Sequence, residues 1–143
     1  MRWLGVDVGT VHVGLAISDV DERIVVPLEI VPANVAFPAI RSIVLRENIQ
    51  GIVVGLPLLP SGDEGRSVRM ARKLGSKLEV NLNIDVYYED ETLTTQAVLS
   101  HEPTINKKHK RRNDDLAATL ILDQFLQKRK FDKIQADTED KKC

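Results

Sequence analysis

The stretch Leu4-Gly-Val-Asp-Val-Gly-Thr-Val-His-Val-Gly-Leu-Ala-Ile-Ser-Asp19 decides how this chain folds. Its alternating apolar runs over residues 4–8 and 13–17 flank a link that contains Gly9 and Thr10, and this pattern predicts a β-hairpin. Asp7 interrupts the first run. A carboxylate in a core strand loses hydration, so it needs a cation or hydrogen-bond donors beside it. Such an Asp suits two kinds of site: one holds a divalent metal beside a phosphodiester, and the other binds the phosphates of ATP.

Length and composition indicate one globular domain. A chain of 143 residues is long enough for a single core but not for two. The net charge of −1 leaves a nucleic-acid partner open, so the distribution of charge has to decide that question. Cys143 is the sole cysteine, which rules out an internal disulfide and favours a reducing compartment. With no leader and no long apolar run, we expect a cytoplasmic protein that does not enter a membrane.

The remaining patterns predict alternating strands and helices. A strand over 23–31 carries Pro27 and should lie at a sheet edge. Residues 51–56 and 84–88 predict parallel strands, and helices are expected from Pro38 to about Asn48, over about 64–79, near 92–99 and from Asn113. This order predicts an α/β fold of the ribonuclease H-like type: a mixed five-stranded sheet with helices on both faces. We expect this domain to span residues 1–128 and the charged residues 129–143 to be disordered.

Acidic residues that are far apart in the sequence converge in this topology. Asp7 lies on the central strand, Glu91 follows the last strand, and Asp114 and Asp115 open the last helix. Clustered carboxylates repel one another unless a cation lies between them. Partial sets of carboxylate oxygens, completed by water and phosphate, typically hold Mg²⁺ or Mn²⁺. Two such ions support in-line hydrolysis of a phosphodiester.

Each acid also has an ordinary structural explanation. Asp7 alone could accept hydrogen bonds from the hairpin backbone, and Glu91 alone could be an exposed turn residue. Asp114 and Asp115 are good helix N-caps. The prediction of a metal site therefore depends on their convergence.

Six motifs in the same order resemble the YqgF family of small bacterial ribonuclease H-like nucleases. Its members are described as Holliday junction resolvases and as pre-16S rRNA nucleases. The motifs are Gly5-Val-Asp-Val-Gly-Thr10, Val13-Gly-Leu-Ala-Ile-Ser-Asp19, Val54-Gly-Leu-Pro-Leu58, Gly62-Asp-Glu-Gly65, Asp90-Glu-Thr-Leu-Thr-Thr95 and Asp114-Asp-Leu-Ala-Ala118.

The resemblance implies a catalytic, metal-binding triad of Asp7, Glu91 and Asp114 that binds two Mg²⁺ or Mn²⁺ ions, with Asp115 as a further candidate ligand. It also implies that backbone and loop positions flank this site, namely Gly9, Thr10, Gly55 and Pro57. The chain departs from the family at Val11-His12, where a basic pair is usual, and in the loop after Leu58. Both departures bear on substrate binding and leave the three acids in place.

Two groups of cations are candidates for phosphate binding. One is a basic block just before the last helix, beside Asp114, and the other is a stripe at helical spacing. A solvated surface is the ordinary explanation for such a stripe. The nucleic-acid-binding candidates are Arg66, Arg69, Lys73, Lys107, Lys108, Lys110, Arg111 and Arg112.

The sequence therefore predicts a metal-dependent endonuclease, and the resemblance implies 5′-end maturation of the 16S rRNA precursor. A Holliday junction is the alternative substrate. Two other classes stay open: an ATP-binding domain of the actin or sugar-kinase type, and a nucleic-acid-binding module without catalysis. The expected partner is structured RNA or branched DNA, and both a homodimer and a monomer are compatible with the sequence.

Overall fold

The computed structural model describes residues 1–57, 65–90 and 113–140, with the backbone alone for 113–115 and 135–140. Five strands form one sheet in the order β3-β2-β1-β4-β5. β2 pairs antiparallel with both β1 and β3, whereas β4 pairs parallel with β1 and β5. The strands are β1 (Trp3–Val8), β2 (His12–Ser18), β3 (Val25–Pro32), β4 (Gly51–Leu56) and β5 (Asp85–Asp90).

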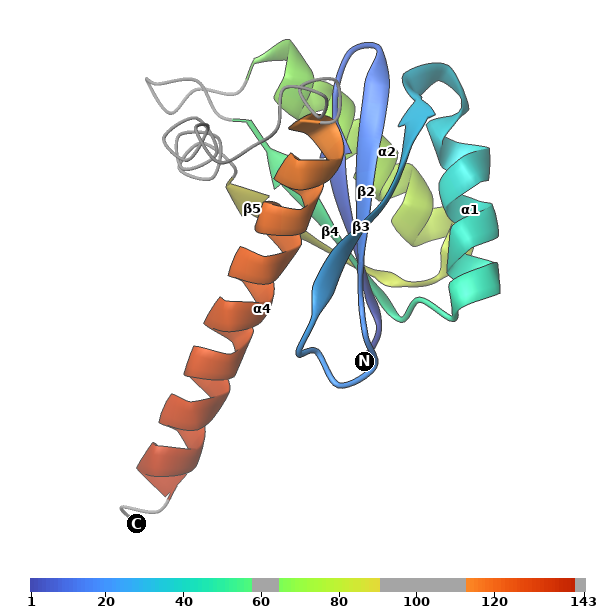
Figure 1. The fold of residues 1–143 in the computed structure, drawn as a ribbon. Helices are drawn as coiled ribbons and strands as arrows, with labels where there is room; N and C mark the ends of the chain where they lie inside the picture. The colour runs from blue at the N-terminus through green and yellow to red at the C-terminus, as the bar shows by residue number, and fades with distance from the viewer. Residues whose placement is uncertain (58–64, 91–112, 141–143) are drawn as a thin grey trace.

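Helices cover both faces of this sheet (Figure 1). α1 (Ala36–Glu47), which follows the short 3₁₀ helix η1 (Ala33–Val35), and α2 (Arg66–Leu82) pack on one face. α4 (Asn113–Asp140) packs on the other. Among the described residues, this is the mixed five-stranded arrangement that the sequence predicts. The bounds of the strands, α1 and α2 agree with the expected ones to within a few residues, and the helix expected near 92–99 lies outside the described residues.

The β1–β2 hairpin forms as predicted because its turn begins at a glycine. The backbone N–H of Gly9 donates to the carbonyl oxygen of His12 at 2.9 Å. A Cβ atom at Gly9 would lie 2.6 Å from that same oxygen, which no side chain tolerates. Glycine is therefore required for this tight turn, and the turn fixes the register that pairs Asp7 with Gly14.

Side chains of β1 alternate between two apolar layers. Leu4, Val6 and Val8 point into the larger core beneath α1 and α2. Trp3 belongs to the smaller core beneath α4, where Ile121, Leu122 and Leu126 are also buried. Residues of one strand parity share a face, so β1 presents positions 3, 5 and 7 to α4. This parity decides where Asp7 points.

Both sheet-covering helices on the first face end at an asparagine in the left-handed conformation. Asn48 caps α1 with φ of 53°, and Asn83 caps α2 with φ of 51°. Asparagine tolerates this region better than other non-glycine residues, so each Asn gives a sharp helix end before the next strand. The predicted position of Pro27 is also confirmed, because β3 is an edge strand.

The C-terminal helix differs from the sequence expectation. Residues 129–143 carry the composition of a disordered tail, yet α4 continues to Asp140. Arg129 explains part of this extension, since its Nε lies 3.2 Å from Glu22 Oε1 and its guanidinium lies 5.2 Å from the centroid of Trp3. Arg129 thus attaches the start of this segment through its charge, and the described residues 129–134 form no continuous apolar stripe, which is why the periodicity of the sequence does not reveal the attachment.

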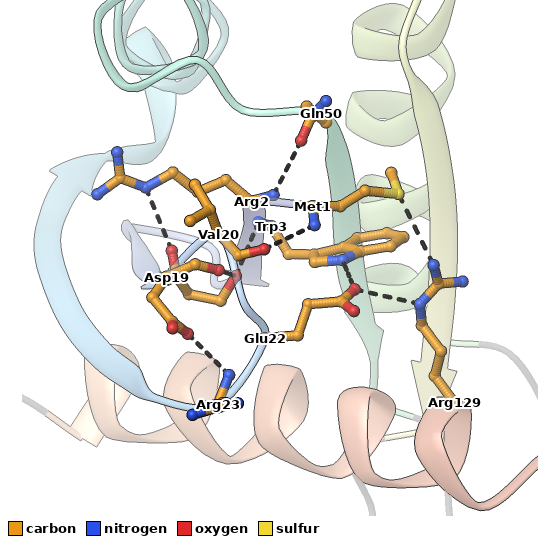
Figure 2. Close-up of polar contacts among 10 residues, drawn as sticks. Met1, Arg2, Trp3, Asp19, Val20, Glu22, Arg23, Gln50 and Arg129 are labelled. Carbon is orange, nitrogen blue, oxygen red and sulfur yellow. Dashed lines mark hydrogen bonds and ion pairs between the residues drawn. The ribbon is translucent and has the colours of Figure 1, made fainter. Parts of the chain in front are cut away.

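Figure 2 shows how the N-terminus and the turn after β2 gather around Trp3 and Arg129. The ammonium group of Met1 donates to the carbonyl of Val20 at 2.8 Å, and the indole Nε1 of Trp3 donates to Glu22. Asp19 Oδ1 accepts from the backbone N–H groups of Ile24 at 2.9 Å and Arg23 at 2.8 Å. These backbone hydrogen bonds, that of Ile24 above all, lower the pKa of Asp19. The cluster lies at the end of β1 that is remote from Asp7 and connects α4 to the sheet.

Candidate functional site

The carboxyl end of β1 is flanked by small residues. Asp7 is half-buried there and pairs with Gly14 of β2. On the other side, the β1–β4 pairing runs as far as Val6 with Val54, so Gly55 is the next position of β4 beside Asp7. Neither neighbour carries a side chain, so the sheet itself leaves room around the carboxylate of Asp7.

Asp7 lies on the face of the sheet that α4 covers. Gly5, two positions earlier, meets α4 so closely that a Cβ atom there would lie 2.8 Å from both Ala118 O and Leu122 Cβ. Since side chains at i and i+2 of a strand point to the same face, the side chain of Asp7 points to the α4 side.

α4 runs antiparallel to β1. The ring of Trp3 packs 5.1 Å from that of Phe125, whereas Gly5 lies under Ala118 and Leu122. Each step along β1 toward Asp7 therefore corresponds to a step back along α4 toward its first turn. Figure 1 shows that this first turn and the β1–β2 turn are at the same end of the molecule. The backbone of residues 113–115 belongs to this turn.

The described residues bring together part of the predicted site. Five of the predicted positions lie where β1 and β4 end, at one end of the sheet: Asp7, Gly9, Thr10, Gly55 and Pro57. Within the described part of the chain, no group of three or more His, Cys, Asp or Glu side chains could hold a metal. Outside the described residues lie Glu91, Lys107, Lys108, Lys110, Arg111 and Arg112, together with the side chains of Asp114 and Asp115.

The basic stripe of α2 lies across the sheet from α4. Arg66, Arg69 and Lys73 are exposed on α2, which packs on the face opposite to the side chain of Asp7. Arg66 is the first residue of α2. Of the three cations, it is therefore the one closest in sequence to the end of β4, where the candidate site lies. The structure thus separates the stripe from the acid by the thickness of the sheet.

Sequence reasoning missed Glu89, a buried carboxylate on the α4 side of β5. It is 6% exposed and pairs with Gly55 in the sheet. Gln124 Nε2 donates to Glu89 Oε1 at 2.7 Å, and the ammonium group of Lys128 also contacts this oxygen. The available signal was strand parity, because residues 87 and 89 of β5 fall on the same face and Tyr87 contacts Phe125 of α4. Glu89 therefore helps to fix α4 against β5 beside the site.

Removing the Lys128 ammonium should weaken this attachment. We expect Lys128→Met to lower the free energy of unfolding by about 1 kcal/mol, because it leaves a buried carboxylate short of one partner. The value is small because the side chain of Lys128 is 62% exposed and therefore well solvated. Urea unfolding measures it, and Lys130→Met, at an exposed position of the same helix, is the matched control. Equal unfolding midpoints for the two variants would contradict this role of the ion pair.

In addition, no helix among the described residues combines the length and apolar character needed to cross a membrane.

Comparisons with known proteins identify relatives of this chain. Residues 1–128 match the model of the RuvX family, which is described as Holliday junction resolvase. A relative from Lactobacillus delbrueckii subsp. bulgaricus is 34% identical over 136 residues, spanning 88% of this chain and 96% of the relative. One from Chloroflexus aggregans is 35% identical over 133 residues, spanning 89% and 94%. Both relatives are named as proposed pre-16S rRNA nucleases.

Solved structures share the fold at much lower identity. RuvC from Thermus thermophilus matches with a TM-score of 0.60 and 16% identity, covering 90% of this chain and 96% of RuvC. The fowlpox virus Holliday junction resolvase matches with a TM-score of 0.55 and 12% identity, covering 90% and 99%. This likeness confirms the ribonuclease H-like fold that the order of elements predicts.

Proposed function

The chain belongs to the RuvX family, and on that premise we propose that it is a metal-dependent endonuclease that matures the 5′ end of the 16S rRNA precursor. It is a hydrolase that acts on the phosphodiester bonds of nucleic acid. We place the nuclease domain in residues 1–128. The observation that carries the proposal is the position of Asp7, half-buried at the carboxyl end of the central strand and directed to the side that α4 covers.

Asp7, Glu91 and Asp114 are proposed as the metal ligands and catalytic acids, with Asp115 as a further candidate. Three features support this set. Asp7 has glycine on both neighbouring strands, α4 runs antiparallel to β1 so that residue 114 falls toward Asp7, and residues 87 and 89 of β5 already face α4, which favours the same side for residue 91.

The chemistry of this donor set fits a hard divalent cation. Carboxylate oxygens are the ligands that Mg²⁺ and Mn²⁺ prefer, and neither cysteine nor a histidine pair belongs to the set. When bound, two such ions lower the pKa of water and offset the charge on the leaving oxygen. The protein's own part is to hold Asp7 on the central strand of the sheet and residue 114 in the first turn of α4, and to leave space for a phosphate beside Asp7.

The proposed partner is structured RNA or branched DNA. The basic block at 107–112 directly precedes α4, so its charges favour phosphate binding next to the acids. The 16S rRNA precursor is the first candidate because both relatives above are named for it. A four-way DNA junction is the second, since the family model is described by that activity. Cutting a junction on two strands would need two sites and hence a homodimer, whereas trimming RNA needs one.

The discriminating experiment compares two labelled substrates. Purified protein is incubated with a 16S rRNA precursor fragment and with a four-way DNA junction, each in Mn²⁺ and in EDTA. We expect cleavage of the precursor in Mn²⁺ and none in EDTA. If the protein cleaves the junction in preference to the precursor, the four-way DNA junction becomes the proposed substrate. Cleavage that survives EDTA would contradict the metal-dependent mechanism.

A further inference from the structure

A cavity of about 350 Å³ lies between α1, α2 and the strand ends of the hairpin. Its walls are mainly apolar, and three polar side chains lie among them. Ligand pockets of small molecules have this size and this mixture of apolar walls with few polar groups. The residues that matter for the argument are Val8, Phe37, Met70, Lys73, Lys77 and Asn34.

The charges around this cavity are positive. Lys73 and Lys77 are exposed and continue the stripe that Arg66 and Arg69 begin on α2. In the part of the chain that the structure describes, no acidic side chain forms an ion pair with either lysine. Lys77 Nζ lies 4.5 Å from the centroid of the Phe37 ring, so its charge is held at the cavity wall. An anion that enters the cavity therefore meets two cations that no acidic side chain of the described residues neutralises.

We propose that this α1–α2 cavity holds one unpaired nucleotide of the substrate, with its base among the apolar walls and its phosphate beside Lys73 and Lys77. The inference rests on the proposed function, because it takes the ligand from the nuclease's own substrate. A base is flat and largely apolar on its faces, which suits walls such as Val8 and Met70. The amide of Asn34 offers both a donor and an acceptor to the edge of the base.

The cavity and the acid site lie on opposite faces of the sheet, both at the carboxyl end of β1. Val8 lines the cavity and Asp7 is its neighbour in the chain, so the two side chains point to opposite faces of the sheet. A single strand that leaves Asp7 can therefore pass over the exposed turn at Thr10 and Val11 and continue along α2. On this path the basic stripe of α2 would contact the phosphates of the strand, although the sheet separates the stripe from Asp7.

The test compares two strands of equal charge. Binding of a fluorescent twelve-nucleotide oligouridylate and of an abasic ribose-phosphate strand of the same length is measured in EDTA, which prevents cleavage. We expect wild-type protein to bind the oligouridylate about tenfold more tightly, as burial of one base predicts. Met70→Trp fills the cavity and should bind both strands equally, at the abasic level.

Matched variants separate the base from the phosphate. Val80→Trp introduces the same side chain at an exposed α2 position and should keep the tenfold preference. Lys73→Gln with Lys77→Gln should weaken both strands and reduce the log–log salt slope by about 1.4, whereas Lys130→Gln with Lys133→Gln on α4 should leave the slope unchanged. Thermal melting checks that each variant is folded.

The outcomes for the cavity and for the nuclease are distinguishable. Equal affinity of wild-type protein for the two strands, or a preference that survives in folded Met70→Trp, would overturn the cavity proposal. Metal-dependent cleavage by wild-type protein, measured in parallel, reports on the proposed function alone. Cleavage by a protein that shows no base preference in binding would therefore contradict the cavity proposal and support the proposed nuclease function.

Discussion

Asp7→Asn should lower the rate of Mn²⁺-dependent cleavage by about a thousandfold or more. The substitution keeps the size of the side chain and removes the negative charge that a divalent cation requires. A thousandfold loss corresponds to about 4 kcal/mol of activation free energy, which is the scale expected when one ligand of a catalytic metal centre is lost. Single-turnover cleavage with excess protein measures it free of product release.

Two controls decide whether the lower cleavage rate of Asp7→Asn results from damage to the metal site. Asp85→Asn makes the same chemical change at an exposed position at the start of β5, the strand end remote from Asp7, and should leave the rate unchanged. The melting temperature of Asp7→Asn should stay near that of the wild type, so that lost activity is not lost folding. A rate within about threefold of wild type would remove Asp7 from the catalytic centre and with it the central support for the proposal.

Gly5→Ala should strongly destabilise the packing of α4 on the sheet. The added Cβ would lie 2.8 Å from the carbonyl oxygen of Ala118 and from Leu122 Cβ. Neither atom can swing aside, because one belongs to the backbone of α4 and the backbone fixes the position of the other. α4 must then move away from β1. Overpacking of this kind typically lowers the free energy of unfolding by about 1–3 kcal/mol. Because residue 114 is in the first turn of the same helix, we also expect slower cleavage.

Gly75→Ala is the informative contrast, because it adds the same methyl group with a different neighbour. There the nearest atom is the hydroxyl oxygen of Tyr88, the far end of a half-buried side chain rather than part of the backbone. Within α2, alanine also favours the helix over glycine by about 1 kcal/mol. Urea unfolding should therefore show a large loss for Gly5→Ala and little change for Gly75→Ala. Similar losses for the two variants would mean that the contact between β1 and α4 is not rigid.

The sequence by itself determined the sheet and the identity of the candidate acids. Alternation over residues 4–8 and 13–17, with Gly9 between them, specifies the hairpin, and the uniformly apolar run of β4 specifies a strand that is covered on both faces. These signals are local, since a strand repeats every two residues and a tight turn depends on one glycine. The position of Asp7 within such a strand is local information as well.

Only the tertiary structure decided how α4 is held and what surrounds it. Glu22 and Arg129 are 107 positions apart, and Glu89 and Lys128 are 39 apart. The α1–α2 cavity likewise combines residues from β1 with residues of α2. Ion pairs and cavity walls of this kind depend on which elements become neighbours when the sheet forms. Local periodicity carries no record of that pairing, so the charged residues after 128 resemble a solvated tail until Trp3 and Glu22 are placed beside Arg129.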